Sequence, residues 1–413
     1  MDVAKGPRRA LVLSGGGARG AYEVGVLDYL LEELPRRTGA PVRFDLITGS
    51  SVGAIHACFL AATADQGPER ARRLADIWSG MQLGEIFQLS TRDALRIPRR
   101  LFGLVRGPAR LRSGRLPPRL HGLLDTTPLE RIVLEQIPWR SIHRNVSEGR
   151  LTAVSVAATQ IATGRVVVFT EHATPERMPW TRDPAILGRA VRLGPHHALA
   201  SAAIPLLFPA VRVENTYYAD GGIRLNTPLA PALRLGATHV LVIALSHGAT
   251  LGEEAELAAG RVESYGNPIF LFGKVLNALL LEHVNADLAH MRVINDILAS
   301  GAEAFGPSFL EKIDPVVERR RGQHFRVVED TVIRPSEDLG RIAAEILMSQ
   351  RDEGRMSAVL RLLLGAVGMG EEITEADLLS YLFFDAEYTR RLIELGRSDA
   401  RARESELAEF FGD

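Results

Sequence analysis

The pentapeptide Gly49-Ser50-Ser51-Val52-Gly53 constrains the fold more than any other stretch of this sequence. It matches G-x-S-x-G and lies between a short apolar run at 44–47, which predicts a buried strand, and an apolar run at 52–62, which predicts a helix. In such a strand–turn–helix unit the serine hydroxyl is exposed at the carboxyl edge of the sheet, and the glycines allow a tight turn. We therefore identify Ser51 as a candidate nucleophile. An ordinary glycine-rich turn is the alternative.

A second glycine-rich loop follows the first predicted strand, at 10–13, and precedes an apolar helical pattern at 21–34 that we expect Pro35 to end. This loop contains Gly15, Gly16, Gly17, Ala18, Arg19 and Gly20. It fits G-x-G-x-x-G for a dinucleotide, but the next strand does not end in an acidic residue that could bind a ribose. A nucleotide P-loop would need Gly-Lys-Ser/Thr, which does not follow. Successive glycine N–H groups can also bind an oxyanion, and Arg19 would add a fixed positive charge.

The two strand–loop–helix units point to one site. Loops that follow parallel strands meet at the same edge of a sheet, where open α/β sheets bind their ligands. An oxyanion-binding loop beside a serine turn favours acyl transfer, because that chemistry needs a nucleophile and donors for the developing negative charge. The dinucleotide interpretation leaves the serine turn unexplained.

A base for the serine is predicted at the end of a later strand, at 217–220, which follows predicted strands at 151–158 and 165–170. Asp220 ends this strand and is followed by Gly221 and Gly222. Asp220 could accept the hydroxyl proton directly, or it could orient a histidine that does so. Among the histidines after Asp220, His247 is the best candidate for such a triad, since it follows the predicted strand at 239–245.

The segment from Thr91 to Leu124 has nine arginines and no acidic residue after Asp93. Apolar residues are interleaved with these arginines, and several prolines prevent one long helix. We expect either a basic insertion that contacts anionic lipid head groups or a solvated surface insertion whose arginines pair with acids elsewhere. Nucleic acid is not expected to be a partner, because no binding motif accompanies the charge and aromatic residues are few.

Composition fits a globular protein, with 413 residues, 46% hydrophobic residues and a net charge of −1. The N-terminus lacks the pattern of a signal peptide, and no apolar run is long enough to cross a bilayer. We therefore expect a cytoplasmic protein, with peripheral contact at the inner membrane face as an option. The neighbours His196 and His197 have no partners at ligand spacing, so neither a metal nor any other cofactor is expected.

The region 251–413 is predicted to be mostly helical. Helical patterns cover 269–290, 339–348, 358–364 and 378–396, and one or two strands near 325–333 could return to the sheet. The charged stretch 397–413 is expected to be solvated.

Four motifs in this order resemble the patatin-like phospholipase family over roughly residues 8–250. They are the loop Gly15 to Gly20, the turn Gly49 to Gly53, the block from Ala200 to Pro209, and Asp220-Gly221-Gly222. The resemblance implies a three-layer α/β/α sandwich with a mainly parallel central sheet, as a hydrolase domain at 8–250 that carries the basic insertion. It implies a Ser51–Asp220 dyad without a catalytic histidine, and an oxyanion hole formed by the loop Gly15 to Gly20.

The activity implied by the resemblance is hydrolysis of lipid acyl esters, with phospholipid or lysophospholipid as substrate. An acyltransferase or a thioesterase using the same Ser51 is the enzymatic alternative. A dinucleotide-binding oxidoreductase remains a less favoured alternative of another class, and a lipid-binding protein without catalytic activity a third.

Overall fold

The structure is a computed structural model that describes residues 6–39, 41–87, 122, 124–174, 185–247, 284–306, 308–321, 324–356, 361 and 380–412. Three expectations fall outside these ranges. They are the basic insertion at 91–124 except for two residues, the first part of the helix at 269–290, and nearly all of the helix at 358–364.

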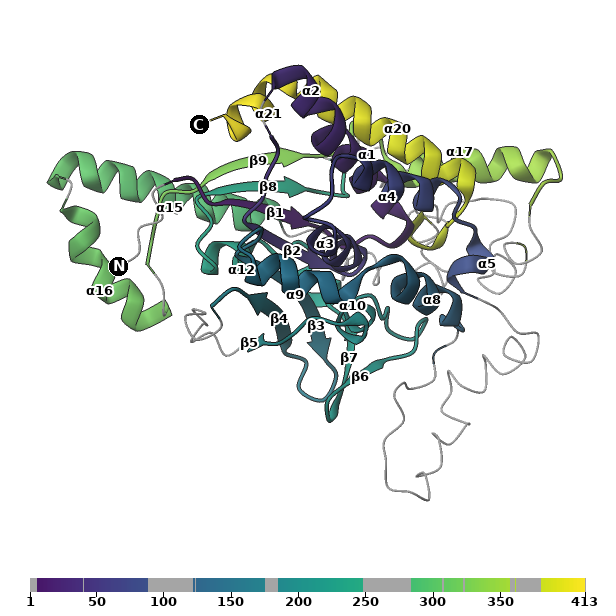
Figure 1. The fold of residues 1–413 in the computed structure, drawn as a ribbon, viewed down its shortest axis with the longest axis horizontal. Helices are drawn as coiled ribbons and strands as arrows, with labels where there is room; N and C mark the ends of the chain where they lie inside the picture. The colour runs from purple at the N-terminus through teal and green to yellow at the C-terminus, as the bar shows by residue number, and fades with distance from the viewer. Residues whose placement is uncertain are drawn as a thin grey trace, which may run out of the picture.

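The described strands form one mixed, mostly parallel sheet (Figure 1). Its order is β5-β4-β3-β2-β1-β8-β9, and β7 pairs with β3 and β6 off this path. The pairs β1–β2, β1–β8, β2–β3, β4–β5 and β8–β9 are parallel. The strand bounds are Arg9–Leu13 (β1), Leu46–Ser50 (β2), Ala153–Gln160 (β3), Val166–His172 (β4), Ile186–Ala190 (β5), Val211–Val213 (β6), Thr216–Asp220 (β7), His239–Ile243 (β8) and Glu329–Ile333 (β9).

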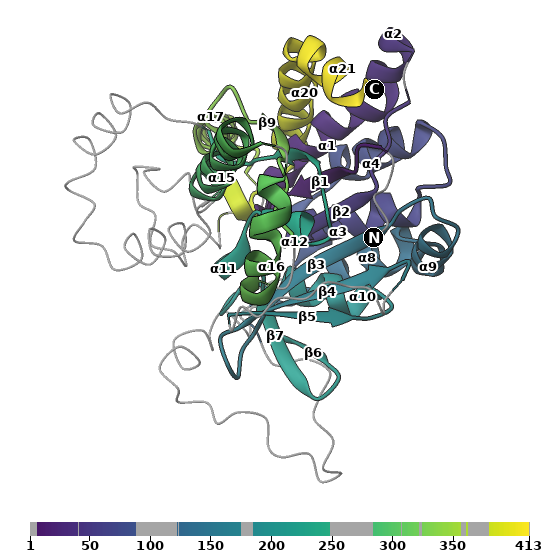
Figure 2. The same ribbon diagram turned by 90° about the vertical axis from the view of Figure 1, so that its left-hand side faces the viewer.

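Helices cover both faces of the sheet, as the side view shows (Figure 2). Along β1, Leu11 and Leu13 belong to one buried cluster and Ala10 and Val12 to another, because successive side chains of a strand point to opposite faces. The predicted α/β/α architecture with a mainly parallel sheet is therefore confirmed.

The larger cluster holds residues of α1 (Gly20–Asp28), α2 (Leu34–Thr38), α3 (Val52–Ala62), α4 (Glu69–Ser79), α5 (Leu83–Ile86), α8 (Thr127–Gln136), α9 (Trp139–Ser147), α10 (Pro195–Ser201), α17 (Leu339–Asp352), α20 (Ala386–Ala402) and α21 (Glu404–Phe411). The smaller cluster holds α12 (Leu229–Arg234) and α15 (Val284–Phe305), and α16 (Phe309–Arg321) packs against α15. The short α11 (Gly222–Leu225) follows β7.

The sequence pattern predicted that the helix after the glycine loop ends at Pro35. In the structure the helix continues past this residue. A π-helical turn at Tyr29–Glu33 follows α1, and α2 then continues to Thr38 with Pro35 in its first turn. The chain is helical without a break on the N-terminal side of Pro35, so the proline leaves one hydrogen bond out of a continuous helix, and the π-helical turn stands directly before it. Gly39, with φ of 73°, ends the helix instead.

The C-terminal region is built into the sheet and its helical layer. Strand β9 pairs in parallel with β8, as the strand pattern near 325–333 suggested. Helix α20 lies along α1, and both views place it above the sheet (Figures 1 and 2). The predicted helix at 378–396 is interrupted at 383–385, because Asp385 caps the start of α20 by accepting the N–H groups of Glu387 and Tyr388.

The end of the chain is not the solvated segment that its charge predicted. Leu407, Phe410 and Phe411 of α21 are buried, and Phe411 packs edge-on against Phe44 at 5.4 Å between ring centroids. The apolar residues of this stretch recur at a helical spacing, so one face is buried while the charges stay on the other.

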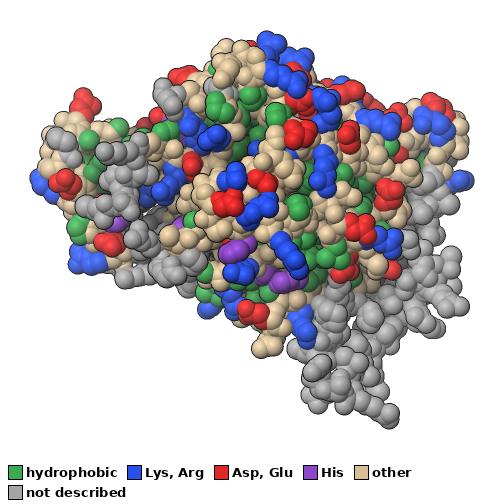
Figure 3. Space-filling model, viewed as in Figure 1, with side chains coloured by type: hydrophobic (Ala, Val, Ile, Leu, Met, Phe, Trp, Pro, Cys, Tyr) green, Lys and Arg blue, Asp and Glu red, His purple; other side chains and the backbone are tan. Residues whose placement is uncertain are grey.

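Basic and acidic side chains are interspersed over the described part of the face in Figure 3. No helix within the described residues is both long and apolar enough to cross a membrane.

Candidate active site

Ser51 stands at the sharp turn between β2 and α3, with φ of 52° and ψ of −124°. A positive φ is uncommon for a residue other than glycine and stores backbone strain. The glycines on both sides are required by space, since a Cβ on Gly49 would lie 2.1 Å from the Gly53 carbonyl oxygen and one on Gly53 would lie 2.5 Å from that of Leu13. The Ser51 N–H donates to Ser201 Oγ at 2.9 Å, which helps to fix the turn.

The Ser51 hydroxyl donates to Asp220, with 2.6 Å between Oγ and Oδ2. Asp220 ends β7, which pairs with β3 in the same sheet, and both side chains are buried. The other carboxylate oxygen, Oδ1, accepts the N–H of Gly222 at 2.7 Å. The two residues that the sequence singled out as nucleophile and base are therefore in direct contact, although they are 169 positions apart.

Burial raises the pKa of Asp220 to about 7, and the hydrogen bonds from Ser51 and Gly222 act in the opposite direction. A carboxylate with an ordinary pKa is a weak base at neutral pH. A pKa close to 7 suits a general base much better, because such a group can take a proton and still be largely ionised.

Gly221, directly after Asp220, leaves no room for a side chain. A Cβ on Gly221 would lie 2.1 Å from the Ala157 carbonyl oxygen and 2.8 Å from Ser50 Oγ. Gly222 then begins α11 and supplies the N–H that Asp220 accepts. The Asp-Gly-Gly sequence thus lets β7 end against the serine turn.

The histidines considered from the sequence have other partners. His247 Nδ1 lies 3.0 Å from the Pro335 carbonyl oxygen, to which it donates. The ring centroids of His196 and His197 are 3.9 Å apart, with the ring planes tilted by 40°, and His197 accepts the Gly194 N–H. Within the described residues, no three His, Cys, Asp or Glu side chains are grouped to hold a metal ion.

The glycine loop lies against the serine turn, since a Cβ on Gly15 would be 3.0 Å from Ser51 Cβ. Three N–H groups of the loop are already used, and that of Gly20 donates to the Gly17 carbonyl oxygen. Gly15 donates to the Asn226 carbonyl oxygen at 3.0 Å, and Arg19 donates to that of Gly16 at 3.1 Å. Among the predicted oxyanion donors, this leaves the N–H groups of Gly16, Gly17 and Ala18, at the start of a helical turn where N–H groups have no partner within the helix.

Two buried residues that sequence reasoning missed join the loops of this site. Glu23 on α1 accepts the Ser14 N–H with Oε1 at 2.8 Å, and its Oε2 lies 2.7 Å from His56 Nδ1 on α3. Burial lowers the pKa of His56 to about 3, so the ring is neutral and donates Nδ1–H to the carboxylate. The sequence signals were an acid at helical spacing from Val26, Leu27 and Leu30 in the pattern at 21–34, and a histidine inside the otherwise apolar pattern at 52–62.

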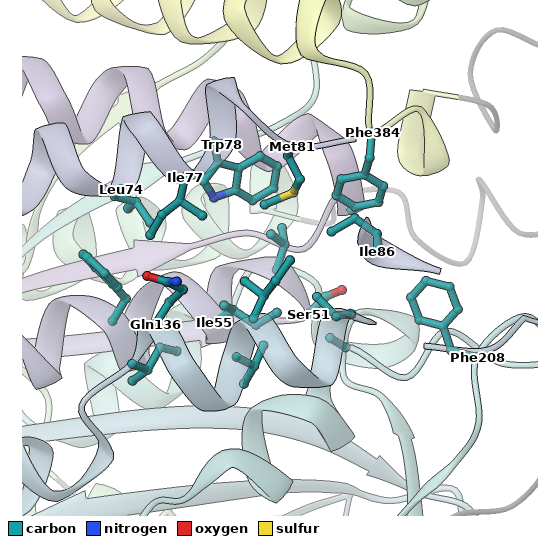
Figure 4. Close-up of a pocket in the computed structure, with 18 of the residues that line it drawn as sticks. Ser51, Ile55, Leu74, Ile77, Trp78, Met81, Ile86, Gln136, Phe208 and Phe384 are labelled. Carbon is teal, nitrogen blue, oxygen red and sulfur yellow. The ribbon is translucent and has the colours of Figure 1, made fainter. Parts of the chain in front are cut away.

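An apolar pocket opens beside Ser51 and runs between α4 and α8 (Figure 4). Ser51 lies near Phe208, Ile86 and Phe384, while Leu74, Ile77 and Gln136 lie further along the pocket. The lining is almost entirely apolar: Gly17, Ser51, Val52, Ile55, Phe59, Leu74, Ile77, Trp78, Met81, Ile86, Leu129, Ile132, Val133, Gln136, Ile137, Ala202, Ile204, Phe208, Tyr381 and Phe384. An elongated apolar group attached to an ester carbonyl at Ser51 fits such a pocket.

Known proteins show similarity to this chain over the same region. A family model described as patatin-like phospholipase matches residues 11–233. A cGAMP-activated phospholipase of Vibrio cholerae is 29% identical over 282 residues, which cover 64% of this chain and 70% of that relative. Another cGAMP-activated phospholipase, from Pseudomonas aeruginosa, is 31% identical over 224 residues that cover 53% of each chain. Among solved structures, VipD from Legionella pneumophila aligns with a TM-score of 0.34 and 14% identity, over 94% of this chain and 67% of VipD.

Proposed function

This chain belongs to the patatin-like phospholipase family, and from that premise we propose that it is a serine lipid acyl hydrolase of the phospholipase A or lysophospholipase type. The observation that carries the proposal is the 2.6 Å hydrogen bond from Ser51 to Asp220 beside an apolar pocket. It joins a nucleophile, a base of raised pKa and space for an acyl chain.

The reaction begins when a lipid ester carbonyl lies against Ser51 with its acyl chain in the pocket. Asp220 takes the hydroxyl proton as Oγ attacks the carbonyl carbon. The N–H groups of Gly16, Gly17 and Ala18 stabilise the developing oxyanion, and loss of one such donor typically costs about 3 kcal/mol. The protonated Asp220 gives its proton to the departing alcohol, which leaves Ser51 acylated.

Water completes the cycle. Asp220, ionised again, removes a proton from a water molecule that attacks the acyl-enzyme, and the fatty acid leaves as Ser51 recovers its proton. If another acceptor replaces water, the same acyl-enzyme makes the protein an acyltransferase, and a thioester substrate would make it a thioesterase. A dinucleotide-binding oxidoreductase is less consistent with the site, because β2 beside the glycine loop ends in Gly49 and Ser50 and not in an acid.

The test is covalent labelling with a fluorophosphonate probe followed by peptide mapping. We expect label on Ser51 in the wild type and none in Ser51→Ala. Ser50→Ala is the matched control, since this neighbouring serine is buried and outside the pocket lining. Calorimetry with NAD and NADP tests the alternative of a dinucleotide-binding oxidoreductase. If the protein is a hydrolase, we expect neither dinucleotide to bind. A folded wild type that is not labelled and binds a dinucleotide would overturn the proposal.

Activation by a nucleotide belongs in the same test, because both relatives described above are named cGAMP-activated phospholipases. We include in the proposal that cGAMP raises the labelling rate of Ser51. Equal rates with and without cGAMP would limit the proposal to a constitutive hydrolase.

A further inference from the structure

A short segment near the end of the chain covers the glycine loop. A Cβ on Gly17 would lie 2.1 Å from the carbonyl oxygen of Tyr381, so the two backbones are in contact. Gly17 lines the pocket beside Ser51, and so does Tyr381. The segment Ser380–Phe384 lies well outside the residues matched by the family model, 11–233.

The same segment holds Arg19. The Arg19 side chain is buried, its Nε donates to Ser380 Oγ at 2.7 Å, and its guanidinium lies 4.2 Å from the centroid of the Tyr381 ring. A guanidinium over an aromatic face is attracted by the ring, and more strongly where water is excluded. Arg19 does not line the pocket, so its contact with the C-terminal segment is better explained as a support of the loop than as a charge for the oxyanion.

The other end of the segment forms part of the pocket wall. Phe384 lies on the serine side of the pocket in Figure 4, and its ring centroid is 6.1 Å from that of Trp78 on α4. Trp78 also packs edge-on against His56 of the nucleophile helix, at 5.2 Å. A side chain in this position limits the width of the pocket where an acyl chain would enter.

The segment is held firmly from behind by α20. A Cβ on Gly25 of α1 would lie 2.0 Å from the Ile393 carbonyl oxygen, and one on Gly396 would lie 2.3 Å from that of Tyr22. The two helices therefore touch backbone to backbone. Tyr22 donates to Asp399 at 3.0 Å, and Arg397 pairs with Asp28 at 2.6 Å. The base of the segment thus has little freedom to move away from the glycine loop.

We propose that Ser380–Phe384 completes the active site: Ser380 and Tyr381 position the glycine loop through Arg19, and Phe384 selects the acyl chain. This inference rests on the proposed function, because it assigns roles relative to the acyl-enzyme at Ser51. Ser380 is a positioning residue, since it acts through the loop. Tyr381 acts through the loop in the same way and also lines the pocket, whereas Phe384 acts only as part of the pocket wall, where it would touch the substrate.

The positioning role is tested with a water-soluble short-chain ester. We expect Tyr381→Leu and Arg19→Gln each to lower kcat by roughly 10- to 100-fold with little change in KM, since small displacements of catalytic groups have effects of this size. The double variant should be no worse than the poorer single one, because both changes remove the same contact. Ser380→Ala, a smaller change, should lower kcat in the same direction and serves if Tyr381→Leu does not fold.

The selective role is tested with a series of esters of increasing acyl length. Phe384→Ala should widen the pocket and shift the highest kcat/KM toward longer or branched chains, whereas Ser380→Ala, outside the pocket lining, should lower all members alike. Arg401→Gln is the matched control. It removes another C-terminal ion pair, with Glu33, one helical turn beyond Arg397 on α20, and should leave kcat and the chain-length profile unchanged.

The outcomes separate the two proposals. A wild type that is neither labelled at Ser51 nor active on any ester would overturn both the hydrolase proposal and this inference. A labelled, active wild type whose folded Ser380, Tyr381 and Phe384 variants keep its kcat and its chain-length profile would overturn the inference alone.

Discussion

The carboxylate of Glu23 lies 2.7 Å from Nδ1 of His56, and both side chains are fully buried between the glycine loop and the nucleophile helix. Because Glu23 also accepts the N–H of Ser14, one side chain connects the end of β1 with the middle of α3. A buried charge is retained only where hydrogen bonds compensate its loss of hydration. The Glu23 carboxylate has two such bonds, and it lies behind both loops of the site.

Removing the charge of Glu23 should destabilise the fold. We expect Glu23→Gln to lower the free energy of unfolding by about 1–3 kcal/mol, because the amide cannot accept from both Ser14 and His56 as the carboxylate does. Urea denaturation measures the change. Glu345→Gln, which removes an exposed ion pair with Arg341, should change it by less than about 0.5 kcal/mol. Equal effects of the two substitutions would contradict a structural role for Glu23.

Substitutions of Asp220 and of His247 should have different effects on the rate of ester hydrolysis. Asp220→Asn should lower kcat/KM by about 10²- to 10⁴-fold, the usual contribution of a general base. His247→Ala should retain most activity, since its ring donates to the Pro335 carbonyl oxygen. Initial rates on a short-chain ester, together with circular dichroism to verify folding, decide the matter. The reverse pattern would replace the dyad with a triad.

The pH profile of hydrolysis should follow Asp220. The base works only when it is ionised, and burial raises its pKa to about 7. We therefore expect kcat/KM for an uncharged ester to rise between pH 5 and pH 8 with a midpoint near 7, and not near 4 as for an ordinary aspartate. A profile already flat at pH 5 would mean that the carboxylate is not the titrating group.

The raised pKa of Asp220 should also make the stability of the fold depend on pH. Because the pKa of Asp220 is higher in the folded than in the unfolded chain, the folded state binds the proton more tightly. The contribution of this group to stability is fully present below the unfolded value and is lost as the pH rises through about 7.

Asparagine does not titrate, so the Asp220→Asn variant does not lose this stability as the pH rises. The melting temperature of Asp220→Asn relative to that of wild type should therefore increase from pH 4 to pH 8 in thermal scans. A difference that is independent of pH would show that the carboxyl titrates alike in both states.

Membrane contact remains a prediction from the sequence alone, since the arginines at 92–119 lie outside the described residues. Replacing several of those between Arg96 and Arg119 should weaken binding to anionic vesicles in a sedimentation assay, by about 1 kcal/mol for each charge that lies near the surface. Hydrolysis of a soluble short-chain ester should be unaffected. Unchanged vesicle binding would indicate a solvated insertion.

The parts of the site that sequence predicted are those with local signals. Ser51 and Gly17 lie in glycine-rich turns between a strand and a helix, and Asp220 ends a recognisable strand. Pattern reasoning does not reach contacts with distant partners. Arg19 was predicted to add a charge for the oxyanion, and its contacts with Ser380 and Tyr381, more than 360 positions away, have no local signal. Likewise, Phe411 stands among charges in the sequence and is buried only because Phe44 faces it.

The contact between Arg19 and Ser380 also sets an order of events during synthesis. The two residues are 361 positions apart, so at typical translation rates the glycine loop leaves the ribosome roughly 20 to 70 s before its support. If the segment is needed as inferred, an incomplete chain carries Ser51 and Asp220 without a working site. Under the proposed lipid hydrolase function, the nascent chain would then be harmless to its own cell until synthesis had passed Phe384.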